Sequence, residues 1–230
     1  MKKYIQESHS RSLKERKEYM MFGTVNVFIK DPFTNNIDMT SVISDIEDTI
    51  PSKFFYNIDM VIIGKFEELE SRGIRAAFMD GAIYVTNDQP SESQVFEDVI
   101  HEIAHSVEKE YGQELYGDGK IESEYLAKKK RFLDNLAANG VRVPNRVRHG
   151  VEYSKVFDEF LHFEMGFEKA NNLSMGVFLT PYSSVSISEY FATAFEHYYV
   201  ESDFATLSAM CPVVYEKIEN INNQGENDEY

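Results

Sequence analysis

The chain has 230 residues, with 39 acidic and 23 basic side chains and a formal net charge of −16. This charge balance argues against broad nucleic-acid binding, which needs a basic face. No stretch is apolar enough to span a membrane, and the basic start of the chain lacks the apolar segment of a secretory signal. We therefore expect a cytoplasmic protein with no nucleic-acid or membrane partner, although delivery by another route stays open.

The length and a hydrophobic content of 43% predict a single folded domain over residues 23–221. Residues 1–22 are predicted to form a basic N-terminal arm, and residues 222–230 a disordered acidic tail. The single cysteine, Cys211, cannot form an internal disulfide, and its apolar surroundings predict a buried filler.

The first part of this domain predicts a small mixed sheet with one crossing helix. Alternating residues and β-branched side chains indicate strands over 24–30, 58–63, 75–79 and 82–86. The last two strands flank Asp80-Gly81, a strong hairpin signal. Asp38 is placed to cap a helix that runs to about Thr49.

The next predicted helix begins at a capping box of Ser91 and Gln94 and runs to about Tyr111, where Gly112 should stop it. With a turn of about 100° per residue, its apolar residues share one broad face. They are Val95, Phe96, Val99, Ile100, Ile103, Ala104, Val107 and Tyr111. His101 and His105 fall together on the opposite face.

Residues 101–105 read His-Glu-x-x-His, a pattern that directs two imidazoles at one metal ion and puts a carboxylate beside them. The plainer alternative is a surface helix with two solvated histidines. A catalytic zinc ion takes three protein ligands and activates a water, and an unligated carboxylate can accept the proton of that water. The motif supplies two ligands, His101 and His105, and a general base, Glu102, but no third ligand.

The remainder of the chain is predicted to be mostly helical, with helices over 121–138, 153–171, 188–199 and 213–221. The charge run Lys128–Arg131 predicts a solvated helix face. The fold class is therefore α+β, with a small mixed sheet packed on the helix of the two histidines and a mostly helical C-terminal half.

Two glutamates compete as the third metal ligand. Glu124 follows His105 by 19 positions on a predicted helix, roughly where thermolysin-type enzymes place their ligand. Glu189 lies at the start of another predicted helix, on its polar stripe. Each has a structural alternative, because Glu124 can be a solvated helix residue and Glu189 can complete a capping box with Ser186.

The segment Glu189-Tyr190-Phe191-Ala192, followed by Ala194-Phe195 and preceded by His-Glu-x-x-His, resembles the catalytic domain of anthrax lethal factor and the Pro-Pro endopeptidases. The likeness continues through Tyr198-Tyr199 and Ala209–Pro212 to Tyr215. These proteins are gluzincins, zinc peptidases with two histidine ligands and one glutamate ligand.

The resemblance implies a gluzincin-like fold and one zinc ion bound by His101, His105 and Glu189, which favours Glu189 over Glu124. It also implies that Glu102 activates the water. Tyr182, seven residues before Glu189, would take the family's catalytic tyrosine position.

The implied substrate is a protein or peptide in extended conformation, paired along residues 82–86, which resemble the family's edge strand. The gap between His105 and Glu189 exceeds that of the relatives, so residues 113–150 are interpreted as an insertion. The relatives are secreted, so their particular substrates do not transfer. The functional alternative is a non-catalytic binding or assembly protein that keeps the metal for stability.

Overall fold

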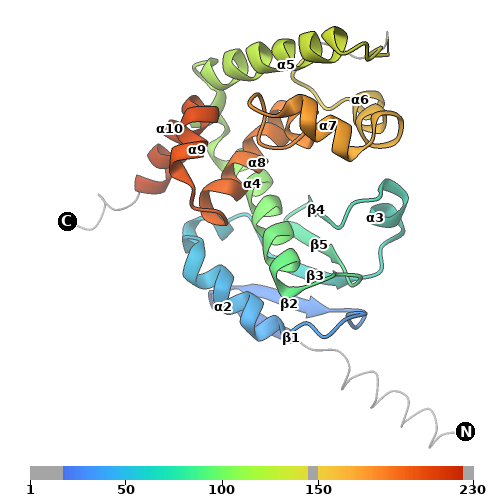
Figure 1. Ribbon diagram of the computed structural model, residues 1–230. Coiled ribbons are helices and arrows are strands. Elements are labelled where there is room, and N and C mark those ends of the chain that lie inside the picture. The colour runs from blue at the N-terminus through green and yellow to red at the C-terminus, as the bar shows by residue number, and fades with distance from the viewer. Residues whose placement is uncertain (1–17, 145–149, 225–230) are drawn as a thin grey trace, which may run out of the picture. The chain divides into compact units, whose positions relative to one another are not determined.

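The computed structural model describes residues 18–144 and 150–224 (Figure 1). The chain forms two compact units that divide between Val107 and Glu108. The fold is α+β, with a mixed sheet in the first unit and helices in the second, as predicted. Within the described ranges, no helix is long and apolar enough to cross a membrane.

The first unit contains one five-stranded sheet with the order β1-β2-β3-β5-β4 (Figure 1). Its strands are β1 (Glu18–Met21), β2 (Val25–Ile29), β3 (Met60–Gly64), β4 (Ala76–Met79) and β5 (Ala82–Thr86). The two central pairings, β2 with β3 and β3 with β5, are parallel. The two outer pairings are antiparallel, so the sheet is mixed.

Two strands differ from the prediction. Residues 18–21, assigned to the basic arm, form β1, because a tight turn at Phe22-Gly23 folds them back onto β2. The rest of the predicted arm, residues 1–17, lies outside the described residues. Residues 82–86 were expected at the edge of the sheet, but β5 is an inner strand. The two-residue turn at Asp80-Gly81 pairs β5 with β4 on one side, and β3 occupies its other side.

The short helices of the first unit are α2 (Met39–Thr49), η1 (Ser52–Phe55) and α3 (Glu67–Arg72). Asp38 caps α2 as predicted, since its side chain accepts the N–H of Thr40 at 2.9 Å. The α3 helix ends at Gly73, whose φ of 66° is the left-handed conformation that glycine adopts readily at a helix end.

The long helix α4 (Glu92–Tyr116) begins where the sequence predicts, with Ser91 Oγ accepting the N–H of Gln94 at 3.2 Å. Most of its predicted apolar face is buried, with Val95, Val99, Ile100, Ile103, Ala104 and Val107 at most 1% exposed. The predicted stop at Gly112 is wrong, because the chain only kinks at Tyr111 (φ −100°, ψ 18°) and then resumes the helix. Leu115, fully buried, holds this last turn in the core.

The second unit continues with α5 (Lys120–Ala138), α6 (Lys155–Glu159), the π-helical η2 (Phe160–Met165), α7 (Phe167–Ser174), η3 (Tyr182–Ser184), α8 (Ile187–Tyr199), α9 (Phe204–Met210) and α10 (Pro212–Asn223). Gly166 interrupts the helix predicted over 153–171, because its φ of 79° and ψ of 149° are not helical. The α8 helix is central to this unit, since it packs against η3, α5, α9 and α10.

An aromatic cluster forms the core between α5 and α8. Tyr125, Phe132, Phe157, Phe178 and Tyr190 are each at most 2% exposed. The rings of Tyr125, Phe178 and Tyr190 contact one another with centroids 5.7–6.2 Å apart. Two of the five residues come from α5, so the segment interpreted as an insertion supplies part of the core.

The turn between β4 and β5 yields a first prediction. Gly81 has a φ of 82°, and a Cβ there would lie 3.0 Å from Asp59 Oδ2. Gly81→Ala should therefore lower the free energy of unfolding by about 1–2 kcal/mol, measured by urea denaturation. Gly112→Ala is the control, because a Cβ there meets no heavy atom within 4 Å. This control should be neutral or stabilising by up to about 1 kcal/mol, and equal losses in the two variants would contradict the argument.

Candidate metal centre

The two predicted histidine ligands lie one turn apart on the same side of α4. Their ring centroids are 5.2 Å apart and the rings are inclined at 75°. Both side chains are partly exposed, whereas the opposite face of the helix is buried. The i, i+4 spacing thus places two imidazoles together, as the sequence predicts.

The predicted general base, Glu102, is largely buried, with 8% of its surface exposed. The backbone N–H of Phe78 donates to Glu102 Oε2 at 2.7 Å. Phe78 belongs to β4, so this bond links the carboxylate to a strand at the edge of the sheet. A hydrogen bond from the rigid sheet restricts the orientation of the carboxylate.

Glu189 lies in the first turn of α8, and its backbone N–H takes part in the helix cap. Ser186 Oγ accepts the Glu189 N–H at 3.0 Å, which is one half of the capping box. The hydroxyl of Tyr182, in η3, donates to Glu189 Oε1 at 3.2 Å. The predicted ligand and the predicted catalytic tyrosine are therefore in contact.

Tyr182 is a hydrogen-bond donor at neutral pH. Burial, followed by the nearby charges of Glu189 and Asp158, raises the pKa of its phenol far above the ordinary value. The phenol therefore keeps its proton.

Among the described residues, one group of three side chains could hold a metal ion. His101, His105 and Glu189 each offer one ligand atom, and these atoms lie within 4.8 Å of one another. Two imidazoles and a carboxylate suit zinc and several other divalent metals. The donor set thus fits a metal without selecting which one.

The competing glutamate, Glu124, has a different role. Its Oε1 accepts the hydroxyl of Tyr190 at 2.7 Å, and its Oε2 accepts the N–H of Val213 at 3.0 Å. Val213 is in the first turn of α10, where a negative charge also interacts favourably with the helix dipole. Glu124 therefore connects α5 with α8 and α10.

One contributor near the ligands, Glu108, was not assigned a role from the sequence. It follows His105 by one turn on α4, and its carboxylate accepts hydrogen bonds from the hydroxyls of Ser188 and Tyr116. Ser188 immediately precedes Glu189. Glu108 lies on the same side of α4 as His101 and His105, which could have marked it as a candidate from the sequence. Its partner Ser188, however, lies 80 residues away in the sequence.

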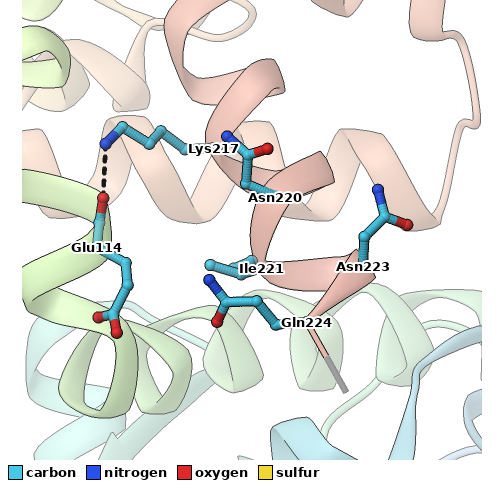
Figure 2. Close-up of a pocket in the computed structure, with 6 residues that line it drawn as sticks. All are labelled: Glu114, Lys217, Asn220, Ile221, Asn223 and Gln224. Atoms are coloured by element: carbon cyan, nitrogen blue, oxygen red, sulfur yellow. Dashed lines mark hydrogen bonds between the residues drawn. The ribbon is translucent and has the colours of Figure 1, made fainter. Parts of the chain in front are cut away.

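A separate hollow of about 500 Å³ lies where the end of α4 meets α10 (Figure 2). Its lining residues are Glu114, Lys217, Asn220, Ile221, Asn223 and Gln224. Lys217 Nζ donates to the carbonyl oxygen of Glu114 at 2.6 Å and pairs with Asp118 at 3.0 Å. None of the predicted site residues lines this hollow, so it is distinct from the candidate metal centre.

No family model, curated protein or solved structure matches this chain. The resemblance to the catalytic domain of lethal factor therefore stays a prediction that depends on the motif residues.

The contacts of Glu124 yield a second prediction. Glu124→Ala removes the acceptor for the buried Tyr190 hydroxyl and for the Val213 N–H, so the free energy of unfolding should fall by about 2 kcal/mol. Chemical denaturation measures this loss. Glu122→Ala, an exposed change on the same helix, is the control and should stay within about 0.5 kcal/mol of the wild type. A Glu124→Ala variant as stable as this control would contradict the structural role.

Proposed function

We propose that this protein is a zinc-dependent metallopeptidase of the gluzincin type, with one zinc ion bound by His101, His105 and Glu189. The grouping of their three ligand atoms within 4.8 Å carries the proposal. Two histidines and one glutamate are the ligand set of thermolysin-like catalytic zinc sites, which keep a further position for water or substrate. A structural zinc site, in contrast, usually takes four protein ligands.

Bound zinc would polarise the scissile carbonyl and lower the pKa of a water to about 7. Glu102 is not one of the three proposed ligands, and in this mechanism its carboxylate accepts the proton of the attacking water. It then transfers this proton to the leaving amine. The Phe78 N–H supports this role, since it holds the Glu102 carboxylate in one orientation at 2.7 Å.

Tyr182 stabilises the oxyanion that develops on the carbonyl oxygen. Its hydroxyl donates to Glu189 at 3.2 Å, which is long for a hydrogen bond between two oxygens. Such a bond is easily exchanged for one to a substrate. A phenol with its ordinary pKa of about 10 is a hydrogen-bond donor at neutral pH, which suits it to this role.

The proposed substrate is a peptide in extended conformation. The strand that supports this proposal is β4, which forms one edge of the described sheet. An edge strand offers backbone groups to an added strand, and β-augmentation is a common way to bind extended peptides. The link from β4 to Glu102 through Phe78 brings this edge close to the proposed base.

The alternative is a non-catalytic protein that uses the metal for stability. Glu102 and Tyr182 argue against it, because metal binding alone requires neither side chain. The two proposals differ in one measurable property. Metal-loaded wild-type protein that cleaves nothing in a broad peptide library would favour the alternative.

The general base is tested by Glu102→Gln. The amide keeps the shape of the side chain and can still accept the Phe78 N–H, but it cannot take up a proton. Zinc content, measured by elemental mass spectrometry, should stay at one ion per chain, while turnover of library peptides falls about 10²–10⁴-fold. Near wild-type turnover would remove Glu102 from the mechanism.

The third ligand is tested by Glu189→Ala. Loss of a residue that only hydrogen-bonds a metal ligand weakens metal binding about 10–100-fold. Loss of a direct ligand should weaken zinc binding by more than this. A competition assay with a chelator measures this affinity. Glu201→Ala, an exposed glutamate just after the same helix, is the control and should bind zinc like the wild type. If Glu124→Ala weakened zinc binding and Glu189→Ala did not, the proposed ligand set would be wrong.

A further inference from the structure

One lysine of the charge run on α5 is buried, contrary to the sequence prediction of a solvated face. Lys129 is 1% exposed, and burial lowers the pKa of its amine to about 8. Its Nζ donates to the Tyr125 hydroxyl at 3.0 Å and to the carbonyl oxygen of Gly150 at 2.9 Å. Both acceptors are uncharged, so the amine is buried at a cost in stability.

The two acceptors of Lys129 lead to the two ends of one segment, Ser184–Ile187. On one side, the Tyr125 hydroxyl donates onward to the carbonyl oxygen of Ser184 at 2.9 Å. On the other side, Val151, the neighbour of Gly150, accepts the N–H of Ile187 at 2.8 Å. Lys129 is therefore linked to both ends of this segment, through Tyr125 on one side and through Gly150 and Val151 on the other.

This segment connects the proposed catalytic tyrosine with the proposed ligand. Tyr182 precedes it in η3, and the Val185 N–H donates to the carbonyl oxygen of Tyr182 at 2.9 Å. The Ser184 hydroxyl donates to the carbonyl oxygen of Pro181 at 2.6 Å. A displacement of Ser184 would therefore move the turn that carries Tyr182.

Packing alone does not account for a lysine at this position. Its Nζ lies 5.2 Å from the ring centroid of Tyr125 and 5.5 Å from that of Phe157, so the site is otherwise aromatic. A methionine of similar length would fill the same space without the desolvation cost of an amine. Residues that lower the stability of a fold are often kept because activity requires them.

We propose that Lys129 is a positioning residue for Tyr182, which it holds in place through Tyr125 and Gly150. The role in turnover rests on the proposed function of Tyr182. The role in fixing the η3 turn does not, so the two can be tested separately.

Hydrogen exchange on the metal-free protein tests the structural role. Lys129→Met should speed the exchange of backbone amides in residues 182–187 by about fivefold or more, because the local opening becomes easier. The middle of α8 should keep its wild-type rates. Lys130→Met is the matched control, since Lys130 is exposed and pairs with Asp134 at 2.6 Å. Unchanged exchange at 182–187, or an equal increase across the second unit, would overturn the proposal.

Turnover by the zinc-loaded protein tests the functional role. Lys129→Met should lower kcat about tenfold with KM and zinc content little changed, because a misplaced donor weakens only the transition state. In a Tyr182→Phe background, the same change should cost nothing further, since the hydroxyl that it positions is gone. Fully additive losses would show that Lys129 acts elsewhere.

Tyr125→Phe provides a second route to the same answer. It keeps the buried ring and removes only the hydroxyl between Lys129 and Ser184, so it should reproduce both effects of Lys129→Met even if that variant folds poorly. If the proposed function is wrong, the wild-type protein will bind no zinc or cleave no peptide. The hydrogen-exchange experiment on the metal-free protein still tests whether Lys129 fixes residues 182–187. Wild-type cleavage with Lys129→Met equal to Lys130→Met in both assays would refute this inference alone.

Discussion

The structure depends on one constraint: a polar group removed from water needs a hydrogen-bonding partner inside the fold. Four ionisable side chains meet it with partners that are distant in the sequence. They are Glu102, Glu108, Glu124 and Lys129, whose partners are backbone groups and the hydroxyls of tyrosine and serine. Because such bonds are short and directional, they fix the elements that carry the candidate site more sharply than apolar contacts would.

Three glutamates show how the surroundings of a side chain decide its role. Both oxygens of Glu124 are occupied, by Tyr190 and Val213, so it serves the architecture of the second unit. Glu102 is held by a backbone N–H, which orients a carboxylate without preventing it from accepting a proton. Glu189 is one of the three candidate ligands and accepts a hydrogen bond from Tyr182. The carboxylate group is thus suited to a structural role in Glu124, to proton transfer in Glu102 and to metal binding in Glu189, the last two being the proposed roles.

The stability of the second unit and the proposed reaction make different demands on its buried groups. The aromatic cluster of α5 and α8 is apolar and packs closely, which favours the fold. Lys129 lies inside this cluster and costs stability, yet it donates to the Tyr125 hydroxyl, which in turn donates to Ser184 at the end of η3. A segment that looked like an insertion therefore contributes both to the core and to the support of Tyr182.

Features that depend on neighbouring residues could be predicted from the sequence alone. They are the Asp38 and Ser91 caps, the Asp80-Gly81 turn, the buried face of α4 and the proximity of His101 to His105. The motif also singled out Glu102, and the resemblance singled out Glu189 and Tyr182. Other features became clear from the folded structure alone. There β5 is an inner strand, α4 continues past Gly112, both oxygens of Glu124 accept hydrogen bonds, and Lys129 is buried. Helix and turn patterns extend over a few residues, whereas Lys129 bonds to a residue 21 positions away and Glu124 accepts from residues 66 and 89 positions away.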